Sequence, residues 1–468
     1  MRFPAARRVF AILLFALMAP APGLLLSAES GDTFKGIVER VEAGKFLVDS
    51  AWVQPARGAR FTGDARSVGR IRVGDWAVVE GRWSGGVFQA SRIKVSRDYP
   101  GHTFQPNLSK QGLSEAEKLK GSKNAYKNPE VEAYVRDIGM SVVPEWSKKQ
   151  FNFQFQVISD PSLNAFALPD GSIFVHTGLL ARVENEAQLA AILGHEVAHV
   201  TERHGAQGYK KQMTTFIPAI IGAEVAGAKV SDKSDNPFVR MATQAGLTLA
   251  VSAAVSGYGR THEDQADRVG LRYAVEAGYD PAPAPGVWDI FNQTYGDESK
   301  IENFFYGNHS TNKVRKGNQQ GEIRRHYDDP SLLHVTRPVN EERYQVTMLS
   351  LTRDNAILDF EAKRTNLARS GFQRVLRYRK NDAPSRTYLG RIALASDTPT
   401  READAEAQFR LAIQADPKYP DAHRELGRLL ASRKRNAEAK GELRKYLDLA
   451  PADAKDRKDV EKELRKIS

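Results

Sequence analysis

One motif limits what this chain can fold into more than any other. Residues 194–199 read GHEVAH, which is the HExxH pattern. Residues four apart on an α-helix lie on one face, so His195 and His199 can both bind one Zn²⁺. Glu196 lies beside them and can take a proton from a water molecule that the ion activates. A random chain with 10 His in 468 residues shows this pattern in roughly one or two cases per hundred, so the context must decide.

The context predicts a helix. Asn185 is a suitable N-cap, and Gln188, three residues on, completes a capping box. Gly205 is a suitable C′ residue after a last turn with Arg203 and His204. The alternative is a core helix with two incidentally satisfied histidines, but a Glu between them is costly to bury without a purpose. An apolar stripe at helical spacing supports the helix: Leu189, Ile192, Leu193, Val197 and Val200.

Cysteine is absent, so the fold has no disulfides and a metal site must use His and carboxylate ligands. The net charge of +11 is spread along the chain. We interpret the basic residues mainly as solvated faces, with an anionic partner or a membrane surface as the alternative.

Residues 1–28 are typical of a secretory signal. Arg2, Arg7 and Arg8 form a positive segment, and residues 9–18 form an apolar segment too short to span a bilayer comfortably. Without cysteine a lipoprotein anchor is excluded, while an uncleaved membrane anchor is the alternative. We therefore expect export to the periplasm of a Gram-negative-type bacterium. Peripheral association with the membrane stays open.

Residues 30–100 change character, because short β-type runs alternate with glycine. Five or six strands in this length predict a small closed barrel, OB-like in type. Trp52, Trp76 and Trp83 suit stacking on nucleic acid, but the export signal argues against a nucleic-acid partner. We expect an accessory or partner-docking role, followed by a linker at residues 101–111.

Residues 112–335 are expected to form an α+β zincin-type domain dominated by helices. Residues 151–157 alternate as a strand, and Asp170-Gly171 is typical of a tight hairpin turn. The strand containing Asn164, Ala165 and Phe166 is a candidate edge that pairs with an extended peptide substrate. An ordinary sheet strand is the alternative.

A catalytic zinc needs a third protein ligand and one open position. Glu263 and Asp267 are four apart in a second predicted helix and share a face. Glu263 can supply the third ligand, and Asp267 can accept a hydrogen bond from a ligand histidine. Charged helix faces are common, so spacing alone is weak support.

Several segments occur in the order typical of family forty-eight of the metallopeptidases, which the chain resembles over about residues 110–330. These gluzincins are related to HtpX and the CAAX prenyl proteases. The resemblance implies that His195, His199 and Glu263 bind zinc and that Glu196 is the catalytic base and acid. It rests on residues 164–166, the hairpin with Gly171, TGLL at 177–180, HExxH ending in Arg203-His204, and residues 263–267 followed by AGYDP at 277–281.

Residues 308–315 match another family element, usually His-Pro followed by an arginine. Here Ser310 replaces the proline, which predicts a less rigid loop. His309 is therefore a candidate to steady an oxyanion or to occupy the open metal position. A loop histidine without a metal role is the alternative.

Residues 214–228 and 247–255 are apolar and rich in Ala and Gly. They contain Glu224 or are shorter than the roughly 20 residues of a membrane span. We interpret them as buried helices or a lid over the cleft, with a membrane-embedded protease as the alternative.

Residues 340–468 carry a repeat. Small and large apolar residues recur at tetratricopeptide (TPR) offsets in residues 420–453 and in the unit before it, and residues 343–380 are a degenerate candidate. Stacked helix pairs of this kind bind peptides or partner proteins. A plain helical cap is the alternative.

Together these features predict an exported zinc endopeptidase whose TPR region docks substrates or a protein partner. The resemblance implies that it acts on misfolded or stalled polypeptides. The layout resembles the group of periplasmic β-barrel assembly-enhancing proteases, which handle outer-membrane proteins whose assembly has stalled. The N-terminal barrel departs from that pattern. A chaperone or adaptor with a latent, lid-covered protease site is the second hypothesis.

Overall fold

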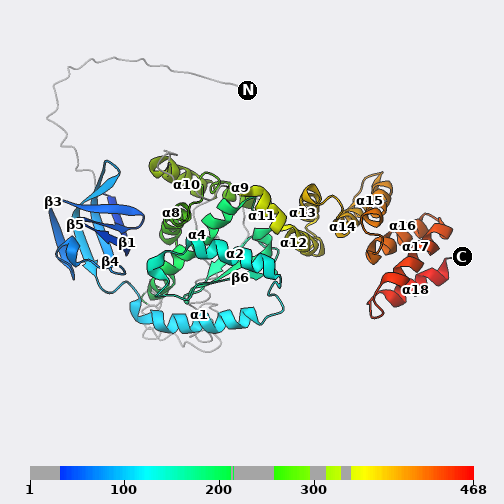
Figure 1. Ribbon diagram of the computed structural model, residues 1–468, viewed down its shortest axis with the longest axis horizontal. Coiled ribbons are helices and arrows are strands. Elements are labelled where there is room, and N and C mark those ends of the chain that lie inside the picture. The colour runs from blue at the N-terminus through cyan, green and yellow to red at the C-terminus, as the bar shows by residue number, and fades with distance from the viewer. Residues whose placement is uncertain (1–31, 212–213, 215–257, 296–311, 328–338, 468) are drawn as a thin grey trace, which may run out of the picture.

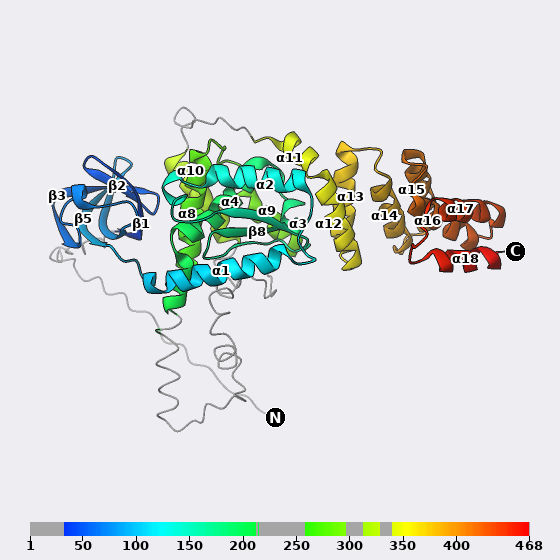
Figure 2. The same ribbon diagram turned by 60° about the horizontal axis from the view of Figure 1, so that its bottom comes forward.

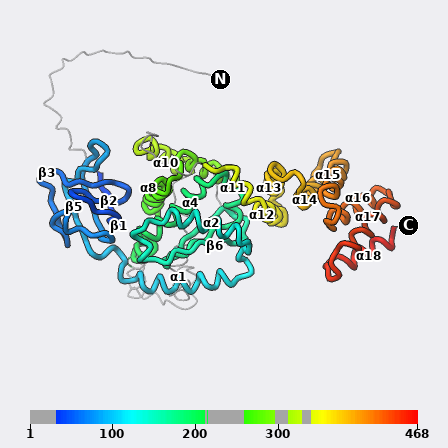
Figure 3. Tube along the Cα trace, in the orientation of Figure 1, coloured from blue at the N-terminus to red at the C-terminus, as the bar shows by residue number. Residues whose placement is uncertain are grey.

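The computed structural model describes residues 32–211, 214, 258–295, 312–327 and 339–467. Three parts follow one another along the long axis of the molecule: a β-barrel, a mixed domain, and an array of paired helices (Figure 1). The chain trace keeps this order from the N-terminal to the C-terminal part (Figure 3). The multidomain architecture expected from the sequence is therefore confirmed.

The N-terminal part is a closed five-stranded barrel in the order β1-β2-β3-β5-β4. Its neighbours pair antiparallel except β3 and β5, which pair in parallel and close the barrel. Apolar side chains from all five strands fill the interior, so the barrel has a hydrophobic core of its own. The strands are β1 (Asp32–Glu42), β2 (Lys45–Val48), β3 (Ala51–Gly63), β4 (Trp76–Ser84) and β5 (Val87–Ser96).

Helix α1 (Gln105–Lys120) begins inside the segment that we expected to be a linker, residues 101–111. Pro106 lies in the first turn of this helix, where a missing N–H group costs nothing. A proline that suggested irregular chain therefore marks a helix start. Helix α1 runs along one side of the central domain (Figure 2).

The central domain surrounds a three-stranded sheet in the order β6-β8-β7, with β6 parallel and β7 antiparallel to β8. Its main core joins this sheet to the helices around it. The strands are β6 (Gln154–Ile158), β7 (Ala165–Ala167) and β8 (Ser172–His176). The helices are α2 (Pro129–Val142), α3 (Thr177–Leu180), α4 (Glu186–Thr201), α8 (Arg260–Glu276), α9 (Gly286–Tyr295) and α10 (Asn312–His326).

Helix α4 begins where the sequence predicted and ends earlier. The Asn185 side chain accepts from the Gln188 amide at 2.9 Å, as an N-cap does. The predicted end at Gly205 is wrong, because Arg203 adopts the left-handed conformation with φ 61° and a helix resumes at residue 204. Arg203 lies over the Phe151 ring at 3.9 Å, a contact that offsets the strain of this conformation.

The C-terminal helices form antiparallel pairs, as expected for TPR-like repeats. Gly371 lies against Ala356, Gly390 against Phe409 and Gly427 against Leu443, so each pair is close-packed at a glycine. The pairs are α12 (Leu349–Glu361) with α13 (Thr365–Tyr378), α14 (Ala383–Leu394) with α15 (Arg401–Ala415), and α16 (Pro420–Ser432) with α17 (Asn436–Leu449), followed by α18 (Arg457–Lys466).

Helix α11 (Glu341–Thr347) falls in the segment expected to open the repeats, yet it belongs to the central core. Tyr344, Met348 and Leu351 are buried in the same cluster as the sheet and α4. The first repeat is therefore packed directly onto the central domain.

Across the ranges that the structure describes, no helix is both long enough and apolar enough to cross a bilayer. The expected signal segment at residues 1–28, the apolar segments at 215–228 and 247–255, and His309 lie outside the described residues.

Candidate metal centre

Helices α4 and α8 approach each other closely at two glycines. A Cβ atom on Gly194 would lie 2.4 Å from the Gly270 carbonyl oxygen, and a Cβ on Gly270 would lie 2.4 Å from the His195 backbone nitrogen. Any larger residue at either position would force the helices apart. This contact brings the HExxH turn of α4 against the helix that carries Glu263.

Three side chains from these helices converge. The Nε2 atoms of His195 and His199 lie 2.9 Å apart. The Glu263 carboxylate lies 3.4 Å from His195 Nε2 and 3.5 Å from His199 Nε2. One ligand atom of each residue falls within 4.8 Å of the others, and all three residues are buried.

This donor set fits a divalent metal ion. Two imidazole nitrogens at 2.9 Å must share a hydrogen or a cation, because two bare lone pairs at this distance repel. Burial disfavours the imidazolium, but hydrogen bonds to Asp267 and Glu263 raise the pKa of His195 to about 10, so the site attracts positive charge. Two imidazoles and one carboxylate are a ligand set used for catalytic zinc.

Asp267 lies where the sequence predicted, behind a ligand histidine. Its Oδ1 atom lies 2.9 Å from His195 Nδ1. The Nδ1–H group of His195 donates to this carboxylate, which leaves the Nε2 lone pair directed at the centre. Asp267 therefore fixes both the tautomer and the orientation of His195.

Arg315 on α10 is a site residue that sequence reasoning did not single out. Its guanidinium donates to both oxygens of Asp267, at 2.9 and 2.7 Å, and lies 3.2 Å from Glu263. It also lies over the Trp288 ring at 4.0 Å. Only 1% of Arg315 is exposed. The family element at residues 308–315 ends in this arginine, so the sequence match could have identified Arg315 as a site residue.

The environment of His199, unlike that of His195, keeps its imidazole neutral. Burial lowers the pKa of His199 well below its usual value. The ring stacks on Tyr258 at 4.0 Å, and its Nδ1 atom lies 2.9 Å from His204 Nδ1. His204, expected only to end the helix, is thus a direct neighbour of the centre.

Glu196 is buried beside the centre, with 3% of its surface exposed. Burial raises the pKa of its carboxyl to about 8, while a backbone hydrogen bond from Ala167 acts in the opposite direction. A carboxyl with a pKa near neutrality is suited to accept and return a proton.

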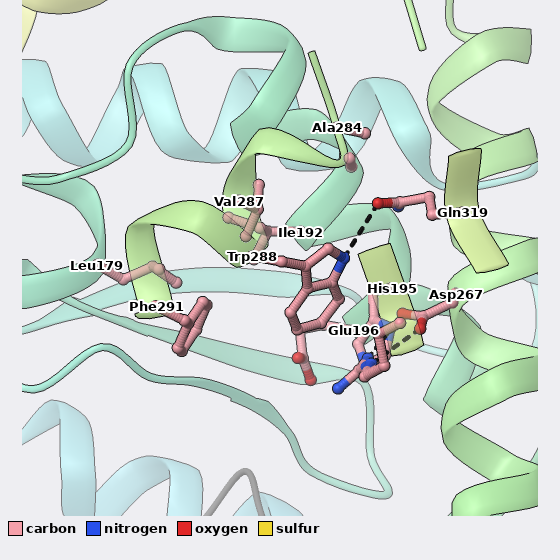
Figure 4. Close-up of a pocket in the computed structure, with 12 residues that line it drawn as sticks. Leu179, Ile192, His195, Glu196, Asp267, Ala284, Val287, Trp288, Phe291 and Gln319 are labelled. Carbon is pink, nitrogen blue, oxygen red and sulfur yellow. Dashed lines mark hydrogen bonds and ion pairs between the residues drawn. The ribbon is translucent and has the colours of Figure 1, made fainter. Parts of the chain in front are cut away.

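A small pocket opens beside Glu196. Trp288 lies between its apolar side chains and the His195/Asp267 pair, and the Trp288 indole donates to Gln319 at 3.1 Å (Figure 4). The pocket is lined mainly by apolar side chains: Leu179, Ala191, Ile192, Ala284, Val287, Trp288 and Phe291. It is suited to an apolar side chain next to the reacting bond.

Strand β7 is an edge of the described sheet. Leu168 donates to the Ser172 carbonyl and His176 to the Asn164 carbonyl, so the even-numbered residues face β8. The main-chain groups of Ala165 and Ala167 therefore face away from β8, and the Ala167 N–H donates to the Glu196 carboxylate. The Phe166 side chain packs against Phe174 and Ala116, and its main chain pairs with β8, so Phe166 belongs to the core and not to the free edge.

The structure thus brings His195, Glu196, His199, Glu263 and Asp267 together, with β7 alongside. It does not describe His309.

Comparison with known proteins places this geometry in context. Residues 127–347 match the sequence model described as Peptidase family M48. The beta-barrel assembly-enhancing protease of Escherichia coli (strain K12) is 28% identical over 167 residues, which cover 36% of this chain and 34% of that protein. The mitochondrial metalloendopeptidase OMA1 of Arabidopsis thaliana is 31% identical over 146 residues, which cover 31% of this chain and 27% of that protein.

The matched segment therefore spans about a third or less of the length of these curated relatives. Among solved structures, the Arabidopsis OM64 TPR domain aligns with 26% of this chain and 98% of its own, at 22% identity and a TM-score of 0.23.

Proposed function

Because residues 127–347 match the model of Peptidase family M48, we propose that the protein is a zinc-dependent endopeptidase of this family. The observation that carries the proposal is the convergence of His195, His199 and Glu263 beside a buried Glu196. Two imidazoles and a carboxylate hold one Zn²⁺ and leave a position open for substrate.

Each residue of the candidate site has a separate role in peptide-bond hydrolysis. His195, His199 and Glu263 would hold the zinc ion, which would supply Lewis acidity to a water molecule and to the substrate carbonyl when bound. Glu196 takes the proton of the attacking water and returns it to the leaving amide nitrogen. Asp267 and Arg315 hold His195 and Glu263 in place during these steps.

The substrate is an extended polypeptide that pairs with β7. The main-chain groups of Ala165 and the Ala167 carbonyl offer pairing positions, with Asn164 and Phe166 holding the strand against β8. The apolar pocket beside Glu196 accepts one side chain next to the scissile bond. Such binding selects unfolded segments, because folded strands already have their partners.

We further propose that the protein acts in the periplasm on misfolded or stalled outer-membrane proteins. The name of the Escherichia coli relative, a beta-barrel assembly-enhancing protease, supports this substrate class. The signal-like residues 1–28 support export. The C-terminal helix pairs provide a surface for a protein partner or for the substrate itself.

Glu196→Gln tests the proposal. The variant keeps the shape of the side chain and the three metal ligands, so it should bind one zinc per chain as wild type does. Cleavage of a urea-unfolded outer-membrane barrel polypeptide, diluted into buffer, should fall about 10²- to 10⁴-fold. Glu130→Gln, at an exposed position on α2, is the matched control and should cleave normally.

Equal cleavage by Glu196→Gln and wild type would refute the mechanism. A wild-type protein that binds zinc, prevents aggregation of the unfolded polypeptide and never cuts it would instead support the chaperone or adaptor hypothesis.

A further inference from the structure

The N-terminal barrel is bound to α8, the helix that carries Glu263 and Asp267. Arg268 donates to both Asp49 carboxylate oxygens at 2.9 Å. One turn further, Arg272 pairs with Glu39, and the Tyr273 hydroxyl donates to Glu39 at 2.9 Å. Glu39 is 1% and Asp49 is 6% exposed, so these charges are desolvated and depend on their partners.

The backbone of strand β1 also contacts side chains next to the candidate metal centre. The Gln265 side-chain amide donates to the Lys35 carbonyl at 3.0 Å and to Glu202 at 3.1 Å. The Ile37 amide donates to the same Glu202 oxygen at 3.0 Å. Between them, a Cβ atom on Gly36 would lie 2.7 Å from the Gln265 amide nitrogen and 2.8 Å from Glu202. The strand therefore comes this close only because residue 36 has no side chain.

The other end of the same amide faces the histidines. Gln265 Oε1 lies 3.1 Å from His204 Nε2, and His204 Nδ1 lies 2.9 Å from His199 Nδ1. A flipped amide would turn its oxygen toward the Lys35 carbonyl and the Glu202 carboxyl, so the barrel fixes its orientation.

This orientation determines which nitrogen of each ring carries hydrogen. Because Gln265 Oε1 accepts, His204 Nε2 donates and its Nδ1 accepts from His199 Nδ1. The Nε2 lone pair of His199 is then left for the metal. Stacking of Tyr258 on His199 and of His262 on His204 holds the ring planes, while Gln265 selects the tautomer.

We propose that Gln265 is a positioning residue that transmits docking of the N-terminal barrel to the zinc ligand His199. The barrel, for which we expected an accessory or partner-docking role, then helps to position a candidate metal ligand. The inference rests on the proposed function for the identity of the metal, but its test measures zinc binding and needs no cleavage.

Gln265→Met, in the full chain, removes the hydrogen bonds of the side-chain amide to His204 and to Lys35 and keeps the side-chain volume. Competition with a chromophoric chelator should show a zinc dissociation constant raised about 10- to 100-fold. Gln345→Met is the matched control. Gln345 lies on α11, is 5% exposed like Gln265, and donates to the Glu184 carbonyl at 2.8 Å. It should change thermal unfolding without changing zinc affinity.

Gly36→Ala tests the contact between the barrel and Gln265 from the barrel side, since its new methyl group would displace β1 from Gln265. It should also weaken zinc binding about tenfold or more. Gly69→Ala, elsewhere in the barrel with no atom near the new methyl group, should bind zinc as wild type does.

Coupling between two sites is reciprocal, so zinc should stabilise barrel docking in turn. Hydrogen exchange of the Ile37 amide, which is bound to Glu202, should slow when zinc is added to wild type but not to Gln265→Met. Wild-type zinc affinity in both Gln265→Met and Gly36→Ala would overturn the inference, as would an Ile37 exchange rate that ignores zinc. If zinc binds as described but no polypeptide is cut, the proposed function fails while this inference stands.

Discussion

Replacing Asp267 with asparagine should weaken both zinc binding and the fold. Asp267 holds the His195 ring at 2.9 Å and pairs with Arg315 through two bonds at 2.9 and 2.7 Å. An asparagine still offers one oxygen to His195, but its amide group faces the guanidinium. Loss of such a partner costs about 10- to 100-fold in metal affinity, or about 1.4 to 2.7 kcal/mol.

The same change removes a charge from a buried ion pair. Arg315 is 1% exposed, and truncation of one partner of such a pair costs about 3 to 5 kcal/mol. Glu263 remains 3.2 Å from Arg315, so we expect the lower end of this range. The unfolding free energy of the metal-free protein should fall by about 3 kcal/mol. Glu263 would then be drawn toward the arginine and away from the metal, which adds to the loss of affinity.

The assay is a chelator competition for zinc together with urea unfolding of the metal-free protein. Asp289→Asn is the matched control, because Asp289 pairs with Lys316 at 2.7 Å on the same domain but is 46% exposed in its side chain. It should change stability by less than about 1 kcal/mol and leave zinc affinity unaltered. If Asp267→Asn and Asp289→Asn behave alike, the assigned role of Asp267 is wrong.

Two further predictions concern packing and pH. Gly270→Ala should destabilise the protein by about 1 to 3 kcal/mol in urea unfolding and weaken zinc binding, because its Cβ would lie 2.4 Å from the His195 backbone nitrogen. The control is Gly321→Ala, on α10 with open space around it, which should be neutral or stabilising. Equal effects of the two substitutions would refute the argument from the close approach of α4 and α8. In the repeats, burial opposes the charged form of His423, but its hydrogen bond to Glu442 raises the His423 pKa, while that bond lowers the Glu442 pKa. The stabilisation from the histidine is therefore lost as pH rises above about 6.5, and that from the glutamate as pH falls below about 4.3. The difference in melting temperature between wild type and Glu442→Gln should be largest between these limits, and a pH-independent difference would contradict the pairing.

Local patterns predicted which side chains lie together at the candidate centre. The spacing of His195 and His199 follows from helix geometry, and the Asn185 cap forms as expected. The barrel and the helix pairs were also predictable, since alternation and repeat offsets record burial along one element.

Contacts between distant segments were not predictable in the same way. Gln265 lies 61 residues from His204 and 230 from Lys35 in the chain, and no periodicity records such a meeting. Arg315 likewise reaches Asp267 across 48 residues. At Arg203 the tertiary contact with Phe151 overrides the glycine preference of a helix end.

The most direct test of the account is a diffraction measurement at the zinc absorption edge on crystals of Glu196→Gln grown with zinc. We predict one anomalous peak per chain, bound by Nε2 of His195, Nε2 of His199 and the Glu263 carboxylate. A zinc-loaded protein whose only peak lies elsewhere, with Glu263 turned away from both imidazoles, would contradict the account.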